Sequence, residues 1–179
     1  MSPDPWKTVE EVVNTVYKRT IEKIGERKND YSNIFFSALI GRASIHSRIE
    51  RSLVTLLGEY APLFFKPFFA NTRSLPPPFD FEGEINGFTY QVKVVSGDKA
   101  FNSAVRDRVA RASFKYYKPI ILTIQGEFFE PQLVGRAIWY SAPHSWWMIG
   151  GEGSYKRFIN IVYNNALKYR DIVWSLIKL

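Results

Sequence analysis

Five side chains that could bind a metal ion and a phosphate fall within one short stretch of the chain. They are Asp80, Glu82, Glu84, Gln91 and Lys93. The dipeptide Asn-Gly at 86–87 is typical of a two-residue type I′ hairpin turn, because both central residues need positive φ. This turn pairs Asp80 with Lys93 and Glu82 with Gln91. Since side chains alternate between the two faces of a strand, all five are expected on one face of the hairpin.

Carboxylate and amide oxygens that converge on one spot are the hard ligands that Mg²⁺ prefers. A bound divalent ion lowers the pKa of a water nucleophile and neutralises charge on a phosphate, and a nearby lysine can contact that phosphate. The alternative is a surface hairpin with an exposed Asp–Lys pair, worth only about a few tenths of a kcal/mol. Three carboxylates on one face repel one another unless a cation is present, which favours a site.

Helical and strand patterns around the hairpin predict an α/β fold with a mixed central sheet and helices on both sides. Asp4 as N-cap and Pro5 as first helical residue mark the start of the first helix, which Gly25 ends. Further helices are expected at 32–40, 43–57, 98–117 and 154–177. Further strands are expected at 63–69, 120–125 and 146–149, with 133–140 ambiguous and 71–78 a proline-rich loop. The length of 179 residues fits one domain.

Composition narrows the possible classes of function. Lysine and arginine number 24 against 17 acidic residues, a net charge of +7 that is common among proteins that meet nucleic acid or an anionic membrane. The absence of cysteine excludes disulfides, thiolate zinc sites and iron–sulfur clusters. The first residues do not read as a secretory signal, and no segment approaches the ~20 apolar residues of a membrane span. We therefore expect a cytoplasmic protein with no membrane partner.

Asp80, its spacing to Gln91-Val92-Lys93 and the order of elements resemble the PD-(D/E)xK nuclease superfamily. Its members share an αβββαβ core, with an acid on the second strand and an acid-x-Lys triplet on the third. Many carry a further glutamate on the first core helix, a position that Glu50 matches. Gln91 departs from the pattern, although some members use Gln-x-Lys. Glu82 or Glu84 would then supply the missing charge, or the site would be less active.

The resemblance covers about 42–125 and implies a function. The small single-domain format is most similar to a type II restriction endonuclease, and the run 146–151 leading into a helix resembles a segment of several such enzymes. The implied reaction is hydrolysis of phosphodiester bonds in double-stranded DNA with Mg²⁺, for which Mn²⁺ would substitute. Cutting both strands of a palindrome favours a homodimer.

The resemblance also implies a role for each site residue. Asp80 and Glu50 would bind the metal, Gln91 would position water or metal, and Lys93 would stabilise the phosphate and the nucleophile. Two alternatives stay open. One is a structure-selective nuclease that acts on Holliday junctions or repair substrates. The other is a non-catalytic DNA-binding protein whose nuclease site has decayed, with Gln91 as the trace of that loss.

Basic and polar residues of the helix expected at 98–117 are the predicted DNA contacts. They are Lys99, Asn102, Ser103, Arg106, Arg108 and Arg111. Lysines and arginines at steps of three and four residues can follow a row of phosphates, and polar groups often contact phosphate as well. The alternative is a solvated basic helix face.

Overall fold

The computed structural model describes residues 4–26 and 44–178. Its contacts group the chain into two compact units, one formed by Met1–Val9 with Ala61–Ile159 and the other by Glu10–Tyr60 with Asn160–Leu179. The helix expected at 32–40 lies outside the described residues. No helix within the described ranges combines the length and the apolar character that crossing a membrane requires.

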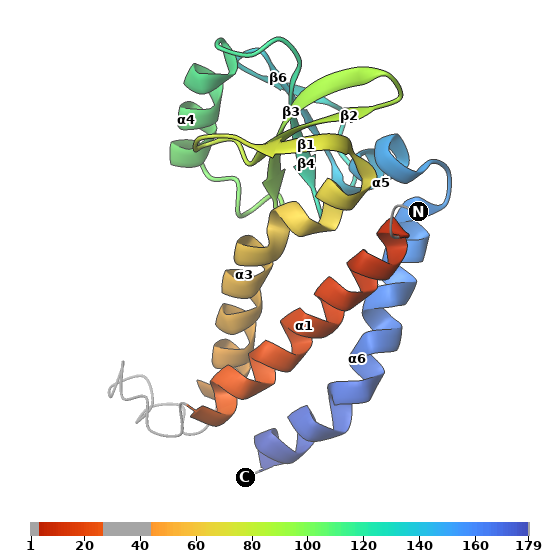
Figure 1. The fold of residues 1–179 in the computed structure, drawn as a ribbon. Coiled ribbons are helices and arrows are strands. Elements are labelled where there is room, and N and C mark those ends of the chain that lie inside the picture. The colour runs from red at the N-terminus through yellow and green to blue at the C-terminus, as the bar shows by residue number, and fades with distance from the viewer. Residues whose placement is uncertain (1–3, 27–43, 179) are drawn as a thin grey trace. The chain divides into compact units, whose positions relative to one another are not determined.

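A six-stranded mixed open sheet forms the centre of the first unit (Figure 1). Its strands are β1 (Ala70–Ser74), β2 (Phe81–Ile85), β3 (Phe88–Val95), β4 (Pro119–Thr123), β5 (Gln132–Val134) and β6 (Ala137–Tyr140). They lie in the order β1-β2-β3-β4-β6-β5. The pairs β1–β2, β2–β3 and β5–β6 are antiparallel, and β3–β4 and β4–β6 are parallel. The predicted α/β class with a mixed sheet is therefore confirmed.

Besides the strands, the described residues form five α-helices and one 3₁₀ turn. They are α1 (Pro5–Glu26), α3 (Ser44–Phe65), the 3₁₀ turn η2 (Lys66–Phe68), α4 (Ser103–Ser113), α5 (Ala142–Gly150) and α6 (Ser154–Lys178). The predicted start of α1 is confirmed, because the Trp6 backbone N–H donates to Asp4 Oδ1 at 3.0 Å. Over 44–123 the order is helix, three strands, helix, strand, as expected for the core.

The strand predicted at 63–69 is wrong. This segment continues α3 and then forms η2. The first strand is β1, which begins at Ala70 and otherwise lies inside the stretch 71–78 predicted to be a loop. Phe64 and Phe65 are fully buried, and their rings contact Phe158 and Trp146. A short apolar run does not distinguish a buried helix from a buried strand. Here the burial of aromatic rings outweighs the helix-breaking tendency of Pro62.

The strand predicted at 146–149 is also wrong, since these residues belong to α5. Trp146 and Ile149 are buried at a spacing of three, whereas Trp147 is 63% exposed, which is a helical pattern and not an alternating one. Ser141 is the N-cap residue, and a proline stands in the first turn, where its missing N–H has no consequence. The indole N–H of Trp146 donates to the Ile124 carbonyl at 2.8 Å, which ties α5 to the end of β4.

Two other predictions need smaller corrections. The helix expected at 98–117 is shorter and begins after Asn102, whose side chain accepts from the Val105 N–H at 3.1 Å and caps α4. The ambiguous segment 133–140 contains most of β5 and all of β6, joined by a turn in which Gly135 has a φ of +63°. The strand expected at 120–125 is confirmed as β4, and the helix expected at 154–177 as α6.

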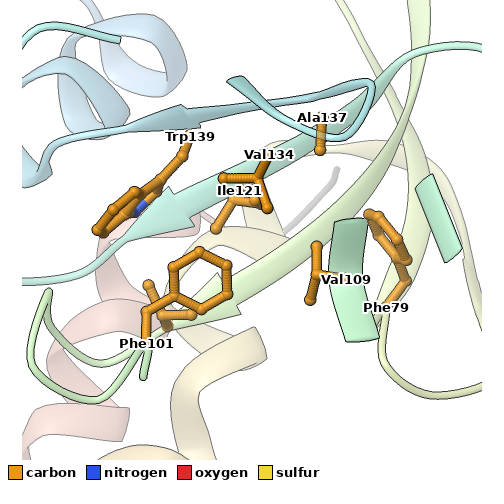
Figure 2. Packing of buried hydrophobic residues seen from close by; sticks show 8 residues of the cluster. Phe79, Phe101, Val109, Ile121, Val134, Ala137 and Trp139 are labelled. Carbon is orange, nitrogen blue, oxygen red and sulfur yellow. The ribbon is translucent and has the colours of Figure 1, made fainter. Parts of the chain in front are cut away.

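Apolar side chains pack between α4 and one face of the sheet, as Figure 2 shows. The cluster consists of Phe79, Val95, Phe101, Val109, Ile121, Val134, Ala137 and Trp139. Lys93 pairs with Ile121 across β3 and β4, and neighbouring residues in register point to the same face. Lys93 therefore points to the face of the sheet that α4 covers, and Val92 and Val94 point to the other.

The second unit is held together by tyrosines and an apolar stripe of α1. Val12, Val13 and Val16 are buried there. The Tyr169 hydroxyl hydrogen-bonds to Asn14 Oδ1 at 2.6 Å, and its ring lies 5.9 Å from that of Tyr17.

Candidate functional site at the hairpin

The hairpin has the predicted turn and the predicted register. Asn86 and Gly87 have φ of 52° and 77°, both positive as a type I′ turn requires. Ile85 pairs with Phe88 next to the turn, and the pairing continues to Glu82 with Gln91 and Phe81 with Val92. Sequence alone determines this register, because the turn is local and two residues long.

Asp80 and Lys93 form an ion pair at the end of the hairpin remote from the turn. Lys93 Nζ donates to Asp80 Oδ1 at 3.1 Å, and the Val94 backbone N–H donates to Asp80 Oδ2 at 2.6 Å. The main chain of Asp80 is fixed as well, since its N–H donates to the Val92 carbonyl and its carbonyl accepts from the Leu75 N–H. The side chains are 19% and 20% exposed, so solvent still reaches the pair. The prediction that these two residues meet is confirmed.

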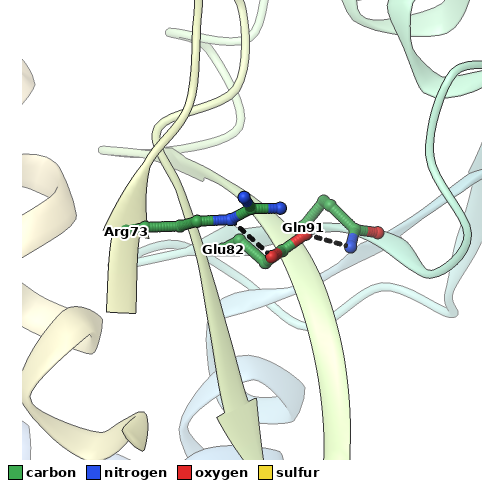
Figure 3. Close-up of polar contacts among 3 residues, drawn as sticks. All are labelled: Arg73, Glu82 and Gln91. Atoms are coloured by element: carbon green, nitrogen blue, oxygen red, sulfur yellow. Dashed lines mark hydrogen bonds and ion pairs between the residues drawn. The ribbon is translucent and has the colours of Figure 1, made fainter. Parts of the chain in front are cut away.

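Glu82 and Gln91 form a second polar contact next along the same face, and Figure 3 shows it with Arg73. Glu82 accepts from Arg73 Nε at 2.7 Å through one oxygen and from Gln91 Nε2 at 2.8 Å through the other. The hydrogen bond from Arg73, and then that from Gln91, lowers the pKa of Glu82. The guanidinium of Arg73, on β1, thus offsets the negative charge of Glu82.

Gln91 uses both ends of its amide inside the protein. Besides donating to Glu82, it accepts through Oε1 from the Lys118 backbone N–H at 2.9 Å, and the residue is only 6% exposed. Its side chain therefore links the hairpin to the residue that precedes β4. The sequence pattern did not reveal these partners, because Arg73 lies on β1 and Lys118 just before β4, and the pairing of these strands with the hairpin depends on the fold.

Glu84 and Glu50 occupy different surroundings. Glu84 is exposed near the turn and accepts from Asn71 Nδ2 at 3.0 Å. It stands four residues from Asp80, about 13 Å at the usual rise of a strand. Glu50 is exposed on the part of α3 that belongs to the second unit.

Asp80 is suited to hold a divalent ion together with water. Each of its oxygens accepts one hydrogen bond, and a carboxylate has about four lone-pair positions, so each oxygen can accept a further contact. Mg²⁺ is commonly held by one or two carboxylates, several waters and substrate phosphates. Within 4–26 and 44–178, no three His, Asp or Glu side chains are grouped closely enough to hold a metal by themselves. The donor set thus fits an ion that the substrate would help to bind.

The predicted DNA contacts have several different environments. Asn102 caps α4, and the Arg106 guanidinium lies 4.4 Å from the Trp139 ring and donates to Gln132 at 3.2 Å. Both therefore have structural partners. Lys99 and Ser103 are exposed around the start of α4. The remaining two, Arg108 and Arg111, are exposed on α4 and line a surface hollow.

Comparison with known proteins adds no identification. No protein-family model matches the chain, and no curated protein matches it either.

Proposed function

We propose that the protein is a Mg²⁺-dependent endonuclease that hydrolyses phosphodiester bonds of double-stranded DNA, of the type II restriction kind. The observation that carries the proposal is the Asp80–Lys93 pair, an acid and an ammonium 3.1 Å apart at the end of a sheet hairpin. The αβββαβ order over 44–123 and the net charge of +7 support it.

The two residues of the pair have complementary tasks. Asp80 offers a carboxylate whose position is fixed by the Val94 N–H and by Lys93. A Mg²⁺ ion bound there would neutralise phosphate charge and lower the pKa of a water. Lys93 has three N–H donors and gives one to Asp80, so two can hold a phosphate oxygen or the attacking water. Gln91 acts by positioning, since it fixes the strand that carries Lys93 against Lys118.

A second candidate function is DNA binding without cleavage. The observation that favours it is that Gln91 is engaged at both ends and Glu82 is offset by Arg73. Asp80 is then the one carboxylate in contact with Lys93 among the residues that the structure describes.

Cleavage of unmethylated phage DNA with Mg²⁺ separates these functions. Asp80→Asn keeps the size of the side chain and one of its two acceptor oxygens but removes its charge, and Lys93→Met removes the ammonium. Each should lower cleavage by at least about a hundredfold, as loss of a charge-stabilising group at a reacting centre commonly does. The matched control is Lys7→Met, at an exposed lysine of the same unit, which should cleave as the wild type does.

The pattern of products decides among the outcomes. Discrete fragments support the restriction enzyme, whereas a smear, or cleavage confined to a four-way junction added as a second substrate, supports a nuclease of another kind. DNA binding that EDTA leaves unchanged, with no cleavage in Mg²⁺ or Mn²⁺, would leave the non-catalytic binder. Full activity of Asp80→Asn would exclude the proposed role of Asp80.

A further inference from the structure

A basic hollow lies between α4 and the loop that leads into β2. Its volume is about 360 Å³, and it is lined by Pro77, Pro78, Arg108, Arg111, Ala112 and Lys115. Arg108 and Arg111 are three residues apart on α4, so their side chains share one face of the helix, and Lys115 follows in the turn after its end. Three of the six lining residues are cationic and none is acidic.

The three cations are not neutralised by the protein groups around them. The ion pairs found among the described residues are Asp80–Lys93 and Arg73–Glu82, and neither involves this hollow. Arg111 Nε donates to the Asp107 backbone carbonyl at 3.3 Å, which leaves the two Nη groups of its guanidinium for another partner. Like charges that line one hollow repel, so an anion between them would stabilise the arrangement.

The wall opposite α4 is fixed and leads directly to Asp80. Phe79 follows Pro78 and is buried, with its ring 4.9 Å from that of Tyr116, one residue beyond Lys115. Asp80 is two residues after Pro78, so their Cα atoms are at most about 7 Å apart. The wall of the hollow that Pro78 forms therefore lies close along the chain to the residue that pairs with Lys93.

We infer that this hollow binds a phosphate group of a DNA strand close to the bond that is cut, an inference that rests on the proposed function. Arginine suits this task because its planar guanidinium donates two parallel hydrogen bonds to a phosphate. The assignment gives Arg108 and Arg111 a common ligand and adds Lys115 as a third contact. A phosphate of a strand and free inorganic phosphate share this chemistry, and the test separates them.

The experiment measures binding of a short labelled duplex by fluorescence anisotropy in EDTA, so that cleavage plays no part. The test variant is Arg108→Gln, Arg111→Gln and Lys115→Gln combined. The matched control removes the same charge from exposed lysines elsewhere, with Lys7→Gln, Lys18→Gln and Lys156→Gln. Single Arg111→Gln is a second variant, and thermal unfolding of each variant checks that it folds.

The hollow variant should bind the duplex at least about tenfold more weakly than the control variant at equal salt. Its plot of log affinity against log salt concentration should be flatter by about one, as for the loss of one phosphate contact. Equal weakening of the two triple variants would overturn the inference, since charge alone would then account for the loss. Arg111→Gln should show part of the same effect, and no change in that variant would count against it.

A second arm titrates inorganic phosphate into the wild-type protein. Displacement of the duplex only at phosphate concentrations far above those of the DNA supports a strand phosphate as the ligand. Tight phosphate binding that Arg111→Gln removes, with duplex binding unchanged, would assign the hollow to free phosphate and overturn the inference. The nuclease proposal fails separately, because it is judged by cleavage in Mg²⁺ and not by binding in EDTA.

Discussion

Replacing Gln91 by glutamate is the most informative single change, because it restores the acid-x-Lys pattern in a place where another carboxylate already lies. In the wild type, Gln91 Nε2 donates to Glu82 Oε2 at 2.8 Å. Gln91→Glu replaces this donor by an acceptor and brings two carboxylates into contact. The bond to the Lys118 N–H can remain, since a carboxylate oxygen accepts it equally well.

The expected destabilisation at pH 7 is about 2–4 kcal/mol. A hydrogen bond to a charged group contributes about 1.5–3 kcal/mol. Two like charges 4 Å apart repel by about 4 kcal/mol at an effective dielectric constant of 20. The total destabilisation cannot much exceed the free energy needed to protonate the introduced glutamate at pH 7, because the protonated form escapes the repulsion. That free energy is about 3.7 kcal/mol for an ordinary glutamate pKa of about 4.3. Once protonated, the introduced carboxyl would donate to Glu82 again.

The pH dependence follows from this limit. Glu82 raises the pKa of the introduced carboxyl in Gln91→Glu. The variant therefore regains free energy of unfolding as the pH falls from 7 to 5, by up to about 1.4 kcal/mol for each pH unit. Urea unfolding at both pH values measures the change. Gln91→Met is the control, because it removes the hydrogen bond to Glu82, and that from the Lys118 N–H as well, without adding charge. Its loss of unfolding free energy should be the same at both pH values.

Magnesium provides a second readout of the same variant. If the carboxylates at positions 80, 82 and 91 can share an ion, Mg²⁺ should restore part of the stability of Gln91→Glu and none of that of Gln91→Met. A destabilisation of Gln91→Glu that is the same at pH 5 and pH 7 would refute the reasoning, because it would mean that no charge repulsion arises at this contact.

Two further predictions concern neighbouring contacts. Asn102→Ala removes the cap that accepts from the Val105 N–H and should lower the free energy of unfolding by about 1 kcal/mol, whereas Ser103→Ala should leave it nearly unchanged; equal thermal shifts for the two would contradict the cap. Arg73→Gln should raise the pKa of Glu82 toward its ordinary value of 4.5, measured by NMR titration. A lowered carboxyl pKa stabilises the fold above that pKa, so the stability difference between Arg73→Gln and the wild type should shrink as the pH falls through 4.5 and vanish below the pKa of Glu82 found in the wild-type titration; a difference that persists below that pKa would point to packing instead.

Whether a contact of the site could be predicted from the sequence depends on how far apart its two partners lie along the chain. Asn-Gly fixes the hairpin register within a few residues, so the meeting of Asp80 and Lys93 followed from local geometry. The partners of Gln91 did not follow. Arg73 lies on a strand that the apolar pattern placed elsewhere, and the Lys118 N–H comes beside Gln91 through the parallel pairing of β3 with β4.

The two wrong strands have one physical cause. The segments 63–69 and 146–149 are short and aromatic, and burial satisfies such residues equally well in a helix or in a strand. For the segment 146–149, a tertiary contact of Trp146 accompanies the helical outcome. Its indole N–H donates to the Ile124 carbonyl from α5, which follows the sheet in the chain. A contact between elements 22 residues apart leaves no trace in local periodicity.

The hydrogen bond from the Val94 N–H to Asp80 has a consequence for how this site can change over generations. An amide of the main chain remains whichever side chain position 94 carries, provided that it is not proline. The acid is thereby anchored independently of the lysine, so a lineage could lose or exchange the residue at position 93 and still inherit a correctly aimed carboxylate.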